Sequence, residues 1–183
     1  FHSTKLFHTI EGGAVITNDD ELAKKVRLMI NFGISSPTAI ESVGTNAKMN
    51  EFEAAMGLCV LDEIDIIRQR REDIWQVYTN ELSNVVEIQQ WNEHGKNNCA
   101  YAPVLFESEE QLLKIEAKLK EKDILPRRYF YPSLDTLSYL GSKQVCNNSR
   151  DIASRILCLP MYPNLEKENI KRILKIIKDG EIE

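Results

Sequence analysis

The chain has 183 residues, of which 43% are hydrophobic and 28% are charged, a composition that is ordinary for a globular protein. Its net charge of −5 provides no electrostatic attraction to nucleic acid or to an anionic membrane surface. No apolar run approaches the ~18 residues that a membrane-spanning helix needs, so the sequence predicts neither a nucleic-acid partner nor a membrane span.

The N-terminal quarter is predicted to contain one strand and one helix. Residues 8–17 are predicted as a strand in which a Gly-Gly pair marks a bulge or a close backbone approach. Residues 18–20 (Asn-Asp-Asp) offer caps and negative charge for a helix start. The apolar residues that follow recur at helical spacing, and Gly33 is a plausible left-handed cap at the end of the helix.

A long loop and two helical stretches follow. Residues 34–48 show no period and are predicted as a loop, long enough to indicate a function. Asn50 and Glu53 have the spacing of a capping box, and the small residues at 54–57 predict that this helix packs tightly against a neighbour. A second helical stretch is predicted from about residue 65 to residue 82.

The second half of the chain mixes strands and helices. Residues 85–88 are predicted as a short strand, and residues 99–106 as a strand that Pro103 places at an edge. Ser108 and Gln111 frame a capping box for a further helix.

Residues 124–131 are predicted as a third strand, residues 148–157 as a short helix and residues 159–163 as an extended segment. Asn164 is a candidate cap for a last helix, with Ile170, Ile173, Leu174 and Ile177 on its buried face. This order predicts an α+β layer, with helices on one face of a small, mostly antiparallel sheet.

The basic, histidine and cysteine residues give no further site. The arginines within residues 68–71 lie among carboxylates, which favours a solvated, salt-bridged helix face over a nucleic-acid surface. The three histidines and four cysteines lack the spacing of zinc ligands, so no metal is expected. We expect reduced thiols and a cytoplasmic protein.

One motif at the beginning of the chain is the most informative. Lys5 lies between aromatic neighbours that could desolvate its amine, although a lysine without context is usually a solvated surface charge. The ordered residues Phe-His-Ser-Thr-Lys at 1–5, Glu-Gly-Gly-Ala at 11–14 and Thr-Asn-Asp at 17–19 resemble the segment of DegT/DnrJ/EryC1/StrS sugar aminotransferases that carries the lysine bonded to pyridoxal phosphate (PLP). The resemblance implies that Lys5 holds PLP and shuttles the proton between the substrate carbon and the cofactor carbon.

The resemblance also implies roles for neighbouring polar residues. His2 and Thr4 either line the phosphate end of PLP or support the turn that presents Lys5. The second motif, residues 44–55, is similar to the family segment whose asparagine reaches across a dimer interface to the phosphate of the partner's PLP, which assigns that contact to Asn46. The alternative is an asparagine that satisfies its own loop. Lys48 stands where the family often has arginine, so the bidentate geometry of arginine is lost.

A third feature is the run Arg-Arg-Tyr-Phe-Tyr-Pro at 127–132. Strand alternation predicts that Arg128 points to the face opposite Tyr131. The run resembles the part of nucleotide-sugar aminotransferases that borders the substrate, where an arginine fork fits a diphosphate, so Arg128 and Tyr131 are the candidate substrate residues. The alternative is a solvated arginine beside half-buried aromatic rings.

The resemblance covers nearly the whole chain and implies an α/β protein of the fold-type-I PLP class. Residues 1–62 would be the tail of the large PLP-binding domain, and residues 63–183 the small C-terminal α+β domain. We interpret the chain as a C-terminal piece of a longer homodimeric enzyme that transfers an amino group, commonly from glutamate, to a keto-sugar nucleotide in surface-polysaccharide or related sugar biosynthesis. The piece alone is expected neither to bind PLP tightly nor to transaminate.

Two alternatives remain open. The first is a PLP-dependent sugar dehydratase of the same family, which Lys5 disfavours because those enzymes replace this lysine with histidine. The second is a non-catalytic regulator or structural module with the same fold. The sequence identifies neither the sugar, the aminated carbon nor the nucleotide.

Overall fold

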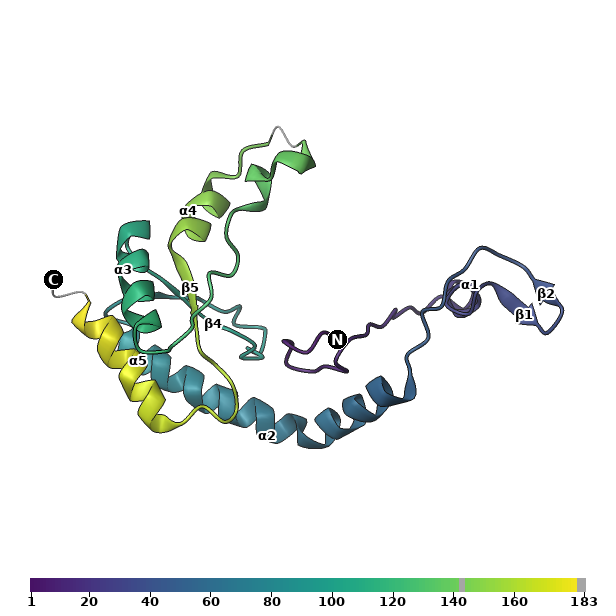
Figure 1. Cartoon of the computed structure of the whole chain (residues 1–183), viewed down its shortest axis with the longest axis horizontal. Helices are drawn as coiled ribbons and strands as arrows, with labels where there is room; N and C mark the ends of the chain where they lie inside the picture. The colour runs from purple at the N-terminus through teal and green to yellow at the C-terminus, as the bar shows by residue number, and fades with distance from the viewer. Residues whose placement is uncertain (142–143, 181–183) are drawn as a thin grey trace. The chain divides into compact units, whose positions relative to one another are not determined.

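The structure is a computed structural model that describes residues 1–141 and 144–180. The chain forms two compact units, Phe1–Asp65 and Ile66–Glu183 (Figure 1). We describe each unit by itself, and the predicted division into a large-domain tail and a small domain stays a prediction.

The first helix of unit 1 begins and ends as predicted. The helix α1 (Asp20–Met29) is capped by Asp19, whose carboxylate accepts the backbone N–H groups of Glu21 and Leu22. At the other end Gly33 has a φ of +75° and donates its N–H to the carbonyl of Leu28 at 2.8 Å.

The strand predicted over residues 8–17 is wrong. Thr9 donates its N–H to the carbonyl of Phe1, but Val15 and Ile16 beyond it are exposed. A β-strand needs a neighbour for its hydrogen bonds, and no ladder partner accompanies residues 8–17 in the part of the chain that the structure describes.

The prediction of a loop without regular structure over residues 34–48 is wrong for residues 34–40. The strands β1 (Ile34–Ser36) and β2 (Ala39–Ile40) form a short antiparallel hairpin in which Ile34 pairs with Ile40. The hairpin is too short and too exposed to show an alternating pattern in the sequence.

The helix α2 (Glu51–Leu82) begins with the predicted capping box. The side chain of Asn50 accepts the N–H of Glu53 at 2.9 Å, and the Glu53 carboxylate accepts the N–H of Asn50 at 3.3 Å. The helix continues without a break into unit 2, whereas the sequence predicted two stretches. Residues 58–64 contain neither glycine nor proline, so nothing in the sequence ends the helix there.

Unit 2 contains a three-stranded antiparallel sheet of strand order β3-β4-β5. Its strands are β3 (Glu87–Ile88), β4 (Ala102–Leu105) and β5 (Ile156–Leu159). Because β4 lies in the centre, the prediction that Pro103 marks an edge strand is wrong.

The position of Pro103 in the ladder explains why it is tolerated there. Pro103 faces Cys158, which directs both its N–H and its carbonyl away from β4, to Arg127. A residue opposite Cys158 therefore needs no N–H toward β5. The two residues of β3 pair only with Val104 and Leu105, so Pro103 loses no hydrogen bond on that side either.

The predicted strand over residues 124–131 is also wrong. Only Arg127 forms a bridge, to Cys158, and the chain turns at residues 129–130. The third strand is instead β5, which the sequence assigned partly to a helix. Leu157 and Leu159 face the core and Cys158 is buried as well. A short apolar run of this kind is compatible both with a buried strand and with the end of a helix, so the sequence pattern does not distinguish them.

The helices of unit 2 follow the sequence more closely. Ser108 caps the helix α3 (Glu109–Lys120) through the N–H of Gln111, and the four apolar residues predicted for the last helix are all buried. That helix begins after Glu166 and not at Asn164, whose side chain accepts a hydrogen bond from Arg70. The helical elements are α3 (Glu109–Lys120), η1 (Leu134–Thr136), η2 (Ser138–Leu140), α4 (Asn147–Arg155) and α5 (Lys167–Asp179).

The core of unit 2 lies between one face of the sheet and the helices α2, α3 and α5, of which α3 and α5 contact each other (Figure 1). Ala102, Val104 and Phe106 point into this core from β4 and its continuation. Tyr78 of α2 is fully buried, and its hydroxyl donates to the carbonyl of Pro160 at 2.8 Å. Arg71 donates to the carbonyls of Cys99 and Ala100, so this arginine is not part of a purely solvated face as predicted.

Across residues 1–141 and 144–180, no helix combines the length and the apolar character required to cross a bilayer.

Asp135 organises the segment before α4. Its carboxylate accepts the N–H of Cys146, the hydroxyl of Ser133 and the Nε–H of Arg150. These contacts, with the backbone N–H of Cys146 first, lower the pKa of Asp135 from 3.8 to about 2.

We predict that Asp135 stabilises the fold only where it is ionised. Because its folded pKa is depressed, its contribution is fully present above pH 3.8 and is lost as the pH falls toward about 2. In thermal unfolding measured from pH 6 down to about 2, Asp135→Asn should lower the midpoint at pH 6 and converge with the wild type at the acid end. Glu110→Gln, which removes an exposed carboxylate from the same unit, is the control. A midpoint difference that is constant with pH would contradict this role.

Candidate functional site

Lys5 lies on a tight turn at the surface of unit 1. Its backbone N–H donates to the carbonyl of His2 at 2.9 Å, which closes the turn. Nδ1 of His2 lies 3.0 Å from the hydroxyl of Thr4, and Nε2 of His2 lies 3.5 Å from the carboxylate of Glu11. His2 thus contacts the turn through Nδ1 and the more distant Glu11 through Nε2, and both roles that the sequence left open for it stay predictions.

The aromatic neighbours of Lys5 do not bury it. Phe1 and Phe7 contact each other edge to face, with ring centroids 5.0 Å apart, and Lys5 is exposed. The expectation that these neighbours desolvate the amine is therefore not met by the described residues. The local chain presents Lys5 and leaves its surroundings open.

The turn is attached to the first part of α2. Thr9 is buried, and a Cβ at Gly57 would lie 2.9 Å from its methyl group. The small residues at 54–57 were expected to let a neighbouring segment pack closely against this helix. Gly57 does so, because it leaves room for Thr9 in the segment that follows Lys5.

The second motif is positioned by the end of α1. The N–H of Thr45 donates to the carbonyl of Met29 at 2.8 Å, the N–H of Ala47 to that of Ile30 at 3.0 Å, and Asn46 forms a bridge with Asn31. The chain passes so close that a Cβ on Gly44 would lie 2.4 Å from the backbone nitrogen of Gly33. A glycine is therefore required at position 44.

Within this motif the side chain of Asn46 has a partner that the sequence did not predict. Nζ of Lys48 donates to Oδ1 of Asn46 at 2.9 Å and lies 4.7 Å from the centroid of the Phe32 ring. In an extended segment, side chains two residues apart lie on the same face. This spacing could have indicated the contact between Asn46 and Lys48 from the sequence. No hydrogen bond joins Asn46 to Lys5 among residues 1–141 and 144–180.

Arg128 and Tyr131 lie together in unit 2. The guanidinium of Arg128 donates to Glu109 at 2.7 Å and to the carbonyl of Ser154 at 2.6 Å, and it stacks 3.8 Å from the centroid of the Tyr131 ring. The prediction that these two residues point to opposite faces is wrong, because the chain turns at residues 129–130 and does not continue as a strand. Arg128 is mostly buried, whereas Tyr131 is half exposed.

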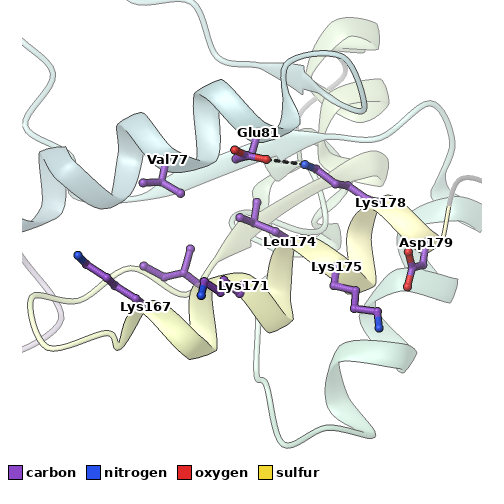
Figure 2. Close-up of a pocket in the computed structure, with 9 residues that line it drawn as sticks. Val77, Glu81, Lys167, Lys171, Leu174, Lys175, Lys178 and Asp179 are labelled. Carbon is purple, nitrogen blue, oxygen red and sulfur yellow. Dashed lines mark hydrogen bonds and ion pairs between the residues drawn. The ribbon is translucent and has the colours of Figure 1, made fainter.

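A lysine-lined groove of about 640 Å³ lies between α2 and α5 of unit 2 (Figure 2). Its lysines project from α5, and Lys178 forms an ion pair with Glu81 of α2 at 2.6 Å. Val77, Ile170 and Leu174 supply its apolar lining. The groove contains none of the candidate site residues, and its features are those of the solvated edge of an amphipathic helix.

The sequence is similar to curated sugar transaminases. It is 37% identical to a dTDP-4-amino-4,6-dideoxy-D-glucose transaminase from Shigella dysenteriae, over 98% of this chain and 51% of the relative. It is 32% identical to an enzyme of the same name from Escherichia coli, over 91% of this chain and 47% of the relative. The chain therefore spans about half the length of the curated relatives that it matches.

Solved structures agree with the fold. DesI, whose structure was determined in the presence of its TDP-sugar product, is 30% identical, with a TM-score of 0.83 over all of this chain and 50% of that one. PseC of Helicobacter pylori, an aminotransferase of pseudoaminic acid biosynthesis, has a TM-score of 0.83 over 94% of this chain and 49% of its own, and at 24% identity it supports the fold alone.

The profile of one family matches almost the entire chain, from residue 1 to residue 178. The α/β fold expected for a PLP aminotransferase is confirmed by the solved structures. The chain belongs to the DegT/DnrJ/EryC1/StrS aminotransferase family.

Proposed function

We propose that the protein containing this chain is a PLP-dependent aminotransferase that moves an amino group from glutamate to a keto-sugar linked to a nucleotide. The observation that carries the proposal is Lys5, presented on an exposed turn within the motif that the family uses to hold PLP. Two relatives named for a dTDP-4-amino-4,6-dideoxy-D-glucose product support a dTDP-linked hexose with a ketone at C4 as the first substrate to test. We place the reaction in surface-polysaccharide or related sugar biosynthesis, in the cytoplasm.

The residues of unit 1 fit this cofactor. PLP carries an aldehyde and a phosphate, and unit 1 offers an exposed primary amine at Lys5 beside the imidazole of His2 and the hydroxyl of Thr4. Lys5 would hold PLP through Nζ, with His2 near the phosphate. When bound, PLP supplies the electron sink for loss of the proton next to the reacting nitrogen.

Lys5 would also move that proton. Its free amine would accept the proton at Nζ from the substrate carbon and pass it to the cofactor carbon, and would move it in the opposite direction when the keto-sugar is aminated. The amine performs this only in its neutral form, which burial or a nearby positive charge favours. We infer that segments outside unit 1 supply that environment, because Lys5 is exposed here.

The Lys5 assignment predicts a spectroscopic result. The complete protein with PLP should show a visible absorption band that glutamate removes, and borohydride should attach the cofactor to Lys5. Lys5→Ala should remove the band and reduce amino-group transfer to a dTDP-linked keto-sugar below the detection limit, because alanine has no amine that can bond to PLP. Lys25→Ala, at another exposed lysine of unit 1, should change neither.

Other outcomes separate the alternatives. A folded complete protein without a PLP band would favour the regulator or structural module, and a label on a different residue would overturn the assignment. A band that glutamate leaves unchanged, with loss of water from the keto-sugar, would favour the dehydratase. The 183-residue chain alone is expected to show no band.

We further propose a homodimer in which Asn46 donates its amide to the phosphate of the partner's PLP. Asn46 and Lys5 are carried by separate hydrogen-bonded segments of unit 1, which is compatible with contributions to different sites. An amide suits phosphate oxygens because it donates without adding a full charge.

This arrangement predicts complementation between two inactive variants. Lys5→Ala and Asn46→Asp subunits should each be inactive, the second because a carboxylate repels the phosphate. After mixing and exchange of subunits, heterodimers contain one intact site, so activity should return to about a quarter of the wild-type value. Each variant mixed with itself is the control. Failure of the mixture to recover activity, with heterodimers demonstrated, would show that Lys5 and Asn46 serve the same subunit's site.

Arg128 and Tyr131 are proposed to border the substrate. Tyr131 is half exposed and can offer its hydroxyl, while Arg128 holds the ring in place beneath its guanidinium. Tyr131→Phe should raise the KM for the sugar nucleotide about fivefold, the effect of one hydrogen bond, without changing the KM for glutamate. Tyr139→Phe, at an 80% exposed tyrosine, is the control. Equal changes in both KM values would contradict a sugar-specific contact.

A further inference from the structure

We propose that Lys48 is a positioning residue that sets the orientation of the Asn46 amide toward phosphate. The inference rests on the proposed function, in which Asn46 donates to the phosphate of PLP. Its structural basis is the hydrogen bond from Nζ of Lys48 to Oδ1 of Asn46, 2.9 Å long. Lys48 does not itself touch the phosphate in this proposal.

The orientation of an asparagine amide decides what it can bind. One end accepts hydrogen bonds and the other donates two, and a phosphate accepts only. An amide whose oxygen faced the phosphate would place two acceptors against each other. Because Lys48 occupies Oδ1, the group that remains for a ligand is the N–H donor end of Asn46.

Phe32 keeps Lys48 in place. The ammonium of Lys48 lies 4.7 Å from the centroid of the Phe32 ring, a favourable distance for a cation above an aromatic face. The backbone N–H of Phe32 donates to the carbonyl of Thr45 at 3.1 Å, directly before Asn46. The ring, the ammonium and the amide are therefore fixed to the same pair of hydrogen-bonded segments.

This role also accounts for a lysine at position 48. A single hydrogen bond to an amide oxygen and a contact with one ring require a cationic donor, and neither requires the bidentate fork of arginine. Lys48→Arg should therefore retain the function. A residue that bound a phosphate directly would be more sensitive to this exchange.

The experiment is a double-mutant cycle on the complete protein, with the dissociation constant of PLP measured by titration of the apoprotein. Lys48→Met, which keeps the length of the chain without the donor, should weaken PLP binding about fivefold to tenfold. Asn46→Ala should weaken it at least as much, and the double variant no more than Asn46→Ala alone. Lys48→Arg should bind like the wild type.

Two controls define the mechanism. Lys24→Met removes the same charge from an exposed lysine of unit 1 that pairs with Glu21, and it should bind PLP normally. Pyridoxal, which lacks the phosphate, should bind equally to wild type, Lys48→Met and Asn46→Ala. Phe32→Leu, which keeps the amine but removes the ring, should weaken PLP binding about twofold to fivefold and serves as a second variant if Lys48→Met does not fold.

Several results would overturn the inference. Additive effects of Lys48→Met and Asn46→Ala would show that Lys48 acts independently of the amide, and equal losses for pyridoxal would show that the phosphate is not involved. A normal Lys48→Met beside a weakened Asn46→Ala would leave the proposed function intact and remove the positioning role. If neither variant changed PLP affinity while Lys5 still bonded PLP, the phosphate role of Asn46 would fail together with this inference.

Discussion

Two backbone segments of unit 1 meet so closely that no side chain fits between them, and the second motif depends on this contact. A Cβ on Gly44 would lie 2.4 Å from the backbone nitrogen of Gly33, whose N–H bonds to the carbonyl of Leu28 in the last turn of α1. The approach lets Thr45 and Ala47 bond to the last carbonyls of α1. Carbonyls at a helix C-terminus lack intrahelical donors, so these bonds satisfy groups that would otherwise need water. Asn46 is held between them.

Lys5 is positioned by a different kind of structure. Its turn is closed by one backbone hydrogen bond and supported by His2, all within a few residues. The packing of Thr9 against Gly57 attaches this turn to α2, but it does not cover the amine. Local structure therefore presents the lysine, whereas its reactivity in the proposed enzyme depends on surroundings that unit 1 does not provide.

In unit 2 the residues that resemble a substrate-binding segment also stabilise the fold. Arg128 connects the start of α3, through Glu109, to the end of α4, through the carbonyl of Ser154. The guanidinium is largely buried, whereas the carboxylate of Glu109 is 41% exposed and could turn to water if Arg128 were removed. Arg128 therefore has structural contacts beside the role proposed for it in the site, and Tyr131 is the more accessible of the two candidates.

The amino-acid sequence by itself determined the features that depend on neighbours a few residues away. The Asp19 cap, the capping box of Asn50 and Glu53 and the buried face of α5 were all predicted, because side-chain caps and helical periodicity act within one or two turns. The family was also evident from its motifs, and the comparisons confirmed it. Only the tertiary structure decided which extended segments pair: residues 8–17 and 124–131 do not form strands, β5 does, and Pro103 lies in a central strand. It alone revealed that the ammonium of Lys48 lies over the ring of Phe32. Strand pairing and side-chain contacts depend on partners that are distant in the sequence, and no local pattern encodes them.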